Sequence, residues 1–358
     1  MWPDRRLLDL FKIEVPIVQA PMAGAQDADI MIGAAQGGAL ASLPCAMLSV
    51  DKAREQMNIV RQRVSAPLNM NFFCHKAVDS TPEQEARWRK RLTPYFRELG
   101  LDPDGAIAAA NRAPFDAVMC ELVEELKPAV VSFHFGLPDK ALLKRVKAAG
   151  CLVISSATIV REARWLEDNG ADAIIAQGAE AGGHRGMFLT ESIANQPGTF
   201  ALVPQVVDAV RVPVIAAGGI ADGRGIAAAF ALGASGVQIG SAYLRCPESK
   251  VIAPARKALA EASDDATVIT NVMTGRPARG VANRVMREVG PVAVEAPPFP
   301  HAATGLSPLK AAAEKLGKVD FTNLWAGQAV PLGKEMPAAE LTRSLAQAAL
   351  QRLGQMRV

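Results

Sequence analysis

Eight short apolar segments alternate along this chain with longer segments that have the residue spacing of amphipathic helices. The apolar segments are almost continuously apolar instead of alternating with polar residues, which is typical of strands buried on both faces of a parallel sheet. Eight such units in sequence predict an α/β fold, a (β/α)8 TIM barrel. The expected strands are Pro16–Met22, Ala39–Leu43, Pro67–Phe73, Ala129–Phe135, Cys151–Ala157, Ala173–Gly178, Pro213–Gly219 and Gly236–Leu244.

Local signals in the intervening segments support this interpretation. Ile159–Asn169 has helical spacing and stops at Gly170, a residue type that readily adopts the left-handed conformation found at many helix ends. Asp222 is expected to cap a helix over Gly223–Leu232. The chain closes with an Ala- and Leu-rich segment, Ala338–Leu353, which we expect to form a helix packed against the barrel.

Two regions do not fit the repeat, and they define the expected domains. His75–Pro114 is charged and helical in pattern, and it forms either a lid over the mouth of the barrel or a solvated helical insertion after the third strand. Residues 247–324 include a Pro-rich stretch and are expected to form a small subdomain on the substrate side. We therefore expect a barrel domain over residues 1–246, interrupted at 75–114, and a C-terminal segment, 325–358, that returns to the barrel.

Composition excludes several functional classes. The chain has 39 Lys and Arg against 36 Asp and Glu and only 5% aromatic residues, so nucleic acid is not an expected partner. No apolar stretch approaches the ~20 residues of a membrane-spanning helix, and Met1–Phe11 lacks the apolar core of an export signal. The five cysteines form no CxxC pair, which predicts reduced thiols and a cytoplasmic protein. No His or Cys spacing typical of a metal site occurs.

Glycines follow two neighbouring strands at the edge where such a barrel places its active site. Gly218 and Gly219 end the seventh strand, and Gly240 and Ser241 mark the end of the eighth. Glycines let main-chain N–H groups approach a phosphate without a cationic side chain. A single glycine pair would be explained by a turn, but paired endings on two strands favour a ligand that carries a phosphate.

The segment Gln177–Gly186, QGAEAGGHRG, follows the sixth strand. Its glycines let the loop pass close to a flat ligand, and the amide of Gln177 can meet ring carbonyl or N–H groups. The loop presents His184, a residue type that suits removal of a proton from a small acidic substrate or hydrogen bonding to an oxyanion. A lone histidine is usually structural, but its place on this loop favours catalysis. Its neighbour Arg185 is expected to be solvated or to face an anion.

The remaining histidines and two cysteines give weaker signals. His134 ends the fourth strand between phenylalanines, so a place on the substrate side and a structural place in the core are equally compatible with the sequence. His75 and His301 are expected in the lid or on the surface. Cys45 and Cys74 have no sequence neighbour that would lower the pKa of a thiol, so nucleophilic catalysis is not expected from them.

Six motifs make the chain similar to a known family. They are QAPMAG at the first strand, NFF at the third, GAEAGGHRG after the sixth, PVIAAGGIADG at the seventh, GVQIGSAYL at the eighth and FTNLWAGQA near the end. In combination they resemble the nitronate monooxygenases, formerly called 2-nitropropane dioxygenases, over about residues 13–330. The resemblance implies an FMN-dependent flavoprotein that oxidises alkyl nitronates, with nitroalkanes as further candidates, using O2 and no reduced nicotinamide. The implied products are a carbonyl compound and nitrite, and the expected assembly is a monomer or homodimer.

The resemblance also implies roles for individual residues. His184 matches the active-site histidine of the family, which acts as a base toward a neutral nitroalkane or positions an ionised nitronate. The phosphate argument adds Gly218, and His134 and Phe299 are candidates on the substrate side. The implied FMN contacts are Met22, Ala23, Asn71, Gln177, Gly182, Gly219, Gln238, Ile239, Gly240 and Ser241.

One segment departs from the family pattern and keeps other reactions open. Bacterial members of the best-studied class carry tyrosines and a lysine in the Pro-rich segment, where this chain has Phe299, Ala303 and Ser307. Related barrels include NAD(P)H-dependent quinone reductases and a flavin-dependent enoyl-ACP reductase, so a flavin reductase is the first alternative. A flavin-free lyase or isomerase barrel that binds a phosphate-bearing ligand is the second.

Overall fold

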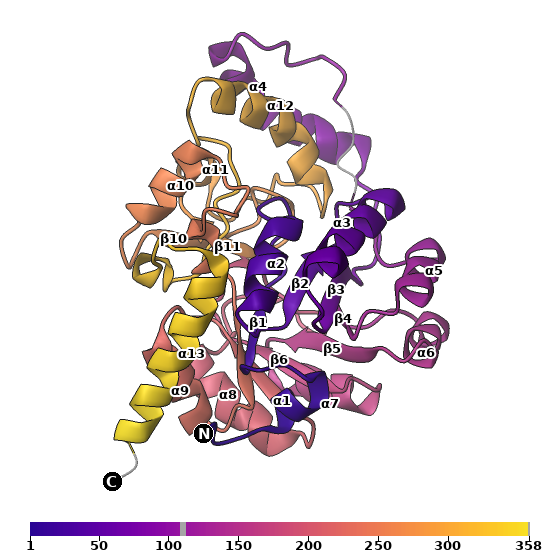
Figure 1. The fold of residues 1–358 in the computed structure, drawn as a ribbon. Coiled ribbons are helices and arrows are strands. Elements are labelled where there is room, and N and C mark those ends of the chain that lie inside the picture. Colours follow the sequence, from indigo (N-terminus) through magenta and orange to yellow (C-terminus); the bar gives the residue numbers. More distant parts are fainter. Residues whose placement is uncertain (108–111, 357–358) are drawn as a thin grey trace.

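The computed structural model describes residues 1–107 and 112–356, and its main feature is a barrel of eight parallel strands surrounded by helices (Figure 1). The strands lie in the order β1-β9-β8-β6-β5-β4-β3-β2, and each strand is hydrogen-bonded to its neighbours in this order. This is the predicted TIM barrel. The barrel strands are β1 (Ile17–Gln19), β2 (Ala41–Pro44), β3 (Leu68–Phe73), β4 (Val130–His134), β5 (Leu152–Ala157), β6 (Ala173–Gln177), β8 (Val214–Ala217) and β9 (Gly236–Ile239).

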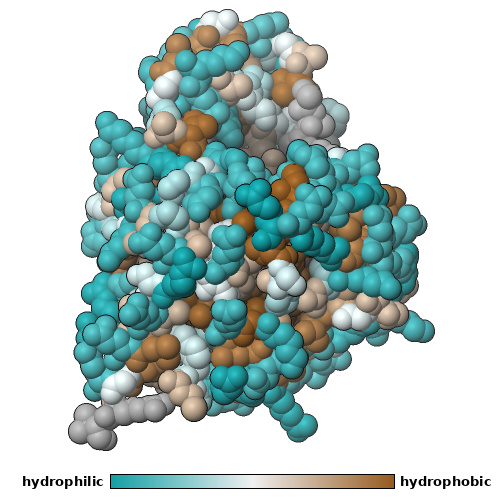
Figure 2. All heavy atoms as spheres, viewed as in Figure 1, coloured by the Kyte–Doolittle hydropathy of each residue, from teal (hydrophilic) through white to brown (hydrophobic). Residues whose placement is uncertain are grey.

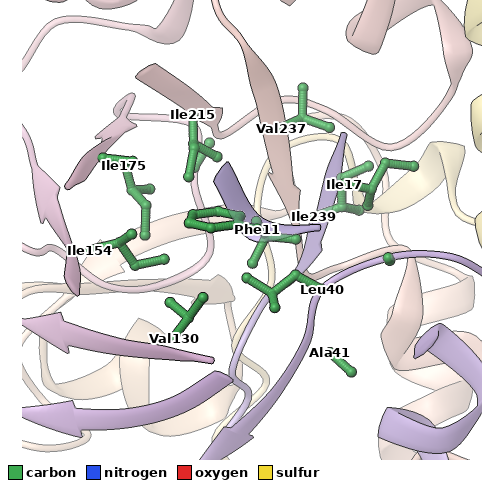
Figure 3. Close-up of a cluster of buried hydrophobic side chains, with 14 of the residues drawn as sticks. Phe11, Ile17, Leu40, Ala41, Val130, Ile154, Ile175, Ile215, Val237 and Ile239 are labelled. Atoms are coloured by element: carbon green, nitrogen blue, oxygen red, sulfur yellow. The ribbon is translucent and has the colours of Figure 1, made fainter. Parts of the chain in front are cut away.

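Main-chain contacts beside the first two strands close the barrel. A parallel bridge joins Val18 to Leu40, just before β2. The N–H of Gln19 donates to the carbonyl oxygen of Leu40 at 2.9 Å, and the N–H of Leu40 donates to that of Ile17 at 3.0 Å. A cluster of buried apolar side chains forms the core, and Figure 3 labels Phe11, Ile17, Leu40, Ala41, Val130, Ile154, Ile175, Ile215, Val237 and Ile239.

All eight predicted strands are present, but some end earlier than the sequence suggests. β9 stops at Ile239 rather than at Leu244, because the chain turns at Gly240 and continues into the 3-10 helix η1 (Tyr243–Arg245). The shorter strands leave the glycines after β8 and β9 in loops at the carboxyl edge of the barrel, where the main chain of these glycines is not used for pairing between strands.

Helices cover the outside of the barrel: α1 (Arg6–Phe11), α2 (Ala28–Gln36), α3 (Val50–Arg63), α5 (Ala117–Leu126), α6 (Lys140–Ala148), α7 (Val160–Asp168), α8 (Thr199–Ala209), α9 (Gly223–Ala231) and α13 (Ala338–Gln355). Two of these helices end or begin at the residues that the sequence predicted. Gly170, just after α7, has a φ of +96°. Asp222 accepts the N–H groups of Arg224 and Gly225 at the start of α9. The last helix, α13, packs against α9 and α2.

A second layer combines segments that are far apart in the sequence (Figure 1). It contains α4 (Pro82–Glu98), α10 (Ala253–Ala260), α11 (Arg284–Val289), α12 (His301–Lys315), the 3-10 helix η2 (Val330–Leu332), and an antiparallel sheet of β10 (Thr267–Thr270), β11 (Ala278–Val281) and β7 (Gly183–His184). The insertion helix α4 lies beside α12, and Trp88 Nε1 donates to the carbonyl oxygen of Ala302 at 3.1 Å. α4 shares a hydrophobic cluster with residues after the eighth strand, so the insertion and the expected subdomain pack together. The domain boundaries at 246 and 324 stay predictions.

The face of the molecule in Figure 2 is dominated by hydrophilic residues, with hydrophobic residues in scattered spots. Isolated exposed apolar side chains, such as Phe200 on α8, are ordinary on protein surfaces. Within the described ranges, none of the helices combines the length and the apolar character needed to cross a membrane.

Candidate active site

A cavity of about 490 Å³ opens at the carboxyl ends of the barrel strands, where the sequence analysis expects the active site. His134 and His184 both line it. Ile239 does not line the cavity, which corrects the prediction for this residue. Its side chain is fully buried in the cluster of Figure 3, because successive side chains of β9 point to opposite faces and that of Gln238 points to the cavity. The other residues expected to contact FMN all line the cavity: Met22, Ala23, Asn71, Gln177, Gly182, Gly218, Gly219, Gln238, Gly240 and Ser241.

The glycines that follow β8 and β9 lie close together beside this cavity. The two strands pair so that Ala217 lies opposite Gln238, which brings their loops together. Gly218 and Gly219 have φ values of +115° and +68°, which other residues rarely adopt. A Cβ at Gly218 would lie 2.8 Å from Oγ1 of Thr199. Both glycines line the cavity, so a ligand there would meet their main chain, as a phosphate site requires.

A buried acceptor beside these loops lacks a partner. Gln238 Oε1 accepts no hydrogen bond from the described residues, and leaving such an atom unpaired costs about 1–3 kcal/mol. Ser241 Oγ accepts the N–H of Gly327 at 2.8 Å, so its own hydroxyl proton is available to a ligand. These donors and acceptors fit a ligand that carries both a phosphate and N–H or O–H groups, as FMN does.

Gln177 holds the loop that carries His184 and does not present a free amide to the cavity. Its Oε1 accepts the N–H of Gly186 at 2.7 Å, and its Nε2 donates to the carbonyl oxygen of His184 at 3.0 Å. The predicted contact of this amide with the edge of a flat ligand is therefore corrected in part. The oxygen and one N–H hold the loop, and one N–H remains for a ligand.

Arg185 is neither solvated nor facing an anion, so that prediction is wrong. Its side chain is fully buried and donates to Gln196 Oε1 at 2.6 Å and to the carbonyl oxygens of Gly178 and Gln177, each at 2.8 Å. Burial lowers the pKa of the guanidinium to about 10, which leaves it charged at neutral pH. Arg185 ties the loop after β6 to the strand from which it leaves, because main-chain carbonyls there need donors.

His184 lies on β7 with its ring among aromatic side chains. Its ring centroid lies 5.4 Å from that of Phe299, 5.5 Å from that of Trp325 and 6.0 Å from that of Phe73. Nε2 of the ring lies 2.9 Å from Oγ1 of Thr274, and none of the described residues forms a hydrogen bond with Nδ1. The ring is thus held at one nitrogen, and the other is left for a ligand.

Burial and cationic neighbours keep the His184 imidazole neutral. Burial lowers its pKa well below the ordinary 6.5, and the charges of Arg112, His134, Arg276 and His75 act in the same direction. Arg112 also lines the cavity, and burial lowers the pKa of its guanidinium. In the described part of the chain no carboxylate pairs with Arg112, so this end of the cavity attracts anions.

His134 stands on the cavity wall with both ring nitrogens bonded. Nε2 lies 3.0 Å from the carbonyl oxygen of His184, and Nδ1 lies 3.1 Å from Oγ of Ser156. Burial lowers its pKa to about 4, so the ring is neutral at pH 7. Because a carbonyl oxygen only accepts, Nε2 carries the proton and Nδ1 accepts from the Ser156 hydroxyl. His134 therefore holds the main chain of His184, and direct contact with a substrate stays a prediction.

His75 is buried, so its predicted place on the surface is wrong, while a place in a lid stays a prediction. Its ring centroid lies 4.8 Å from that of Phe299 and 6.1 Å from that of Phe135, and burial lowers its pKa to about 4. His301, at the start of α12, lies 2.9 Å through Nε2 from the carbonyl oxygen of Val78 in the insertion. Phe299, expected on the substrate side, lies in the aromatic cluster around the active-site histidine.

Four residues of this region were not identified from the sequence: Phe73, Arg112, Thr274 and Trp325. Phe73 and Trp325 belong to the NFF and FTNLWAGQA motifs, but their contact with a histidine depends on the fold. Thr274 lies in TNVMTGRPARG, and Arg112 lies near the end of the insertion. Nothing in the local sequence of Thr274 or Arg112 distinguishes either of them from ordinary polar residues.

The cysteines supply no reactive thiolate. Cys45 is buried and Cys74 is partly buried, and burial raises the pKa of both thiols far above the ordinary value, so both stay protonated. In residues 1–107 and 112–356, no group of three or more His, Cys, Asp or Glu residues could hold a metal ion.

Comparisons with known proteins point to one family. A family model described as nitronate monooxygenase matches residues 4–348. The chain is 39% identical over 355 residues to the nitronate monooxygenase of Paraburkholderia phytofirmans, covering 99% of this chain and 97% of the relative. It is 39% identical over 342 residues to that of Pseudomonas aeruginosa, covering 95% and 97%. A solved nitroalkane oxidase from Streptomyces ansochromogenes has a TM-score of 0.88 at 35% identity, covering 98% of this chain and 99% of that one.

Proposed function

The chain belongs to the nitronate monooxygenase family, and on that premise we propose that it binds FMN and oxidises alkyl nitronates with O2 to a carbonyl compound and nitrite. Membership makes it an oxidoreductase that acts on nitro compounds. The observation that carries the finer proposal is the neutral ring of His184 beside Arg112, at the edge of a glycine-lined cavity.

The residues of the cavity fit FMN. Main-chain N–H groups after β8 and β9 would hold the phosphate, and Ser241 would donate its hydroxyl proton to it. Gln238 Oε1 would accept an N–H or O–H group of the cofactor, and Gln177 has one N–H left to donate. When bound, FMN supplies the electron transfer that side chains do not provide.

The electrostatics of the site favour an anionic nitronate over a neutral nitroalkane. A histidine whose pKa is far below 6.5 is a weak base, so His184 is poorly suited to removing a carbon-bound proton. The same charges that oppose a second proton on this ring, those of Arg112 and Arg276, attract the oxygens of a nitronate. His184 then orients the nitronate, while the rings of Phe73 and Phe299 exclude water from it.

An anaerobic titration of the purified protein tests the cofactor and the reaction together. We expect flavin absorbance bands, and FMN in the supernatant after the protein is denatured. Propyl-2-nitronate added without oxygen should change the flavin spectrum, and admission of oxygen should release nitrite. NADPH added in the same way should leave the spectrum unchanged on the time scale of turnover. His184→Asn serves as the matched variant that keeps the cavity but loses the ring.

Other results of the same titration would identify the alternatives. Rapid bleaching by NADH or NADPH with no response to the nitronate would identify a flavin reductase of the quinone or enoyl-ACP type. A colourless protein that binds no added FMN would favour a lyase or isomerase with a phosphate-bearing ligand. The monomeric or homodimeric state and the cytoplasmic location stay predictions.

A further inference from the structure

Thr274 bonds the ring of His184 from a distant part of the sequence. It lies in the turn between β10 and β11, and β11 pairs with β7 so that Ala278 lies opposite His184. This small sheet brings Thr274 Oγ1 to 2.9 Å from Nε2 of the histidine. The threonine is fully buried, so water does not compete for its hydroxyl.

The hydroxyl proton of Thr274 has two acceptors within reach among the described residues. One is Nε2 of His184 at 2.9 Å, and the other is the carbonyl oxygen of Arg276 at 3.4 Å. Hydroxyl donors normally lie about 2.5–3.0 Å from their acceptors, so the shorter contact is the better hydrogen bond. A contact of 2.9 Å suits a hydrogen bond in either direction, but the hydroxyl proton is better placed at Nε2 than at the carbonyl oxygen 3.4 Å away. With the hydroxyl donating to Nε2, that nitrogen carries a lone pair and no proton.

We propose that Thr274 is a positioning residue that fixes His184 as the Nδ1–H tautomer, so that the ring offers an N–H donor to the nitronate. The identity of the ligand rests on the proposed function. A neutral imidazole carries one proton, and with Nε2 accepting from Thr274 that proton is on Nδ1. The oxygens of an anion accept hydrogen bonds, so this tautomer matches the charge of the ligand. It is also the tautomer that cannot act as a base through its free nitrogen.

The charged and titratable groups around the ring agree with this assignment. Arg112 and Arg276 act on His184 as positive charges, and so do the rings of His75 and His134 when they are protonated. Burial and the charges of the two arginines oppose a second proton on the ring, which therefore stays neutral near pH 7. A neutral ring offers one donor and one acceptor, and the threonine decides which nitrogen is which.

His134 provides a contrast within the same site, because its bonds require the other tautomer. Its Nε2 donates to the carbonyl oxygen of His184, and its Nδ1 accepts from Ser156. Two histidines that lie together are thus expected to carry their single protons on opposite nitrogens.

Nitrogen-15 NMR of protein labelled at its histidines tests the proposal without turnover. The chain has four histidines, and loss of one set of ring signals in His184→Asn and in His134→Asn assigns the two that matter. At pH 7 we expect a protonated Nδ1 and an unprotonated Nε2 for His184, and the reverse for His134. A protonated Nε2 on His184 would overturn the proposal.

Two variants separate the hydroxyl from the volume of the side chain. Thr274→Val removes the hydroxyl and should abolish the preference of His184 for the Nδ1–H form, whereas Thr274→Ser should keep it. The unchanged pattern of His134 shows in each case that the fold is intact. Thr274→Val should also raise KM for propyl-2-nitronate roughly three- to tenfold, with a smaller change in kcat, and Thr274→Ser should restore KM. If His184 keeps the same tautomer in Thr274→Val, the threonine does not set it and the proposal is wrong.

The two readouts distinguish the two proposals. If His184 and Thr274 behave in NMR as expected but the enzyme releases no nitrite from nitronates, the positioning role stands and the proposed function fails. If nitrite is released but His184 carries its proton on Nε2, the function stands and the positioning role fails.

Discussion

The ring of His134 donates a hydrogen bond to the carbonyl oxygen of His184 at 3.0 Å. The same oxygen accepts a second hydrogen bond from Nε2 of Gln177, also at 3.0 Å. Residue 186 is a glycine at a place where a Cβ would lie 2.9 Å from Cε1 of His134 and 2.8 Å from Cβ of Ser156. The position of the His184 imidazole is therefore set through its main chain by groups on β4, β5 and β6.

His134→Phe should lower kcat/KM for propyl-2-nitronate about tenfold while the flavin content stays unchanged. Phenylalanine suits the aromatic surroundings but cannot donate to the carbonyl of His184, and a lost buried hydrogen bond costs about 1–3 kcal/mol. Oxygen consumption and the ratio of flavin to protein absorbance are the measurements. Ser156→Ala removes only the bond to Nδ1 and should lose less. Equal losses in the two variants would contradict the importance of the carbonyl contact.

Arg112→Gln should raise KM for the nitronate about tenfold, because hydrogen bonds to charged groups contribute about 1.5–3 kcal/mol. Arg112 lines the cavity, and no carboxylate of the described chain neutralises it. Arg112→Lys keeps the positive charge and should lose less. Steady-state kinetics at two salt concentrations measure the effect, since a charge interaction weakens as salt increases. An unchanged KM in the glutamine variant would exclude this arginine from nitronate binding.

Gly218→Ala should raise the Kd for FMN at least about tenfold. A positive φ disfavours alanine by about 1–3 kcal/mol and the added methyl group approaches Thr199, so the loop that lines the cavity must move away from the conformation that meets the ligand. Titration of the apoprotein by flavin fluorescence measures it. Gly150→Ala is the matched control, since Gly150 also has a positive φ, +86°, but lies outside the cavity with open space around its Cβ. It should reduce stability slightly and leave FMN affinity unchanged. Equal effects on affinity would show that the glycines after β8 do not hold the cofactor.

Arg185→Met should lower the free energy of unfolding by about 3 kcal/mol or more, because it removes the guanidinium donors from the carbonyl oxygens of Gln177 and Gly178 and from Gln196 Oε1. Urea unfolding measures the change. Arg224→Met is the control: Arg224 pairs with Asp222 at 2.5 Å, but its side chain is 63% exposed, so its loss should cost less than about 1 kcal/mol. Similar losses in the two variants would contradict the structural role of Arg185.

The free energy of unfolding should fall as the pH falls from about 6.5 to 4. Burial lowers the pKa of both His75 and His134 from 6.5 to about 4, so between these values the unfolded chain binds more protons than the folded one. The free energy of unfolding therefore rises with pH over this window. The contribution of these two histidines is complete above it. Urea unfolding across the window measures the slope, and His134→Phe should make it shallower. A slope that is the same in the variant would place the cause elsewhere.

The barrel and the rim of its cavity could be predicted because both follow from local pattern. An apolar run such as Ala173–Gly178 forms a strand buried on both faces wherever helices cover the sheet, and Asp222 caps a helix by accepting the N–H groups of residues two and three positions later. Parallel strands of a barrel present their carboxyl ends at one rim. Gly218, Gly240 and His184 therefore had to meet there once the strands were counted correctly.

Local pattern says how a segment folds but not which side chain of another segment it will meet. Arg185 was expected in solvent or facing an anion and is buried, and Thr274 gave no signal although it bonds a ring 90 positions away. Burial, hydrogen-bond partners and the protonation of a ring depend on contacts between distant segments, which form only when the sheets and helices pack. The strands and their order could thus be predicted from the local sequence. The chemical state of His184 was decided by the packing of β7 and β11 over the barrel.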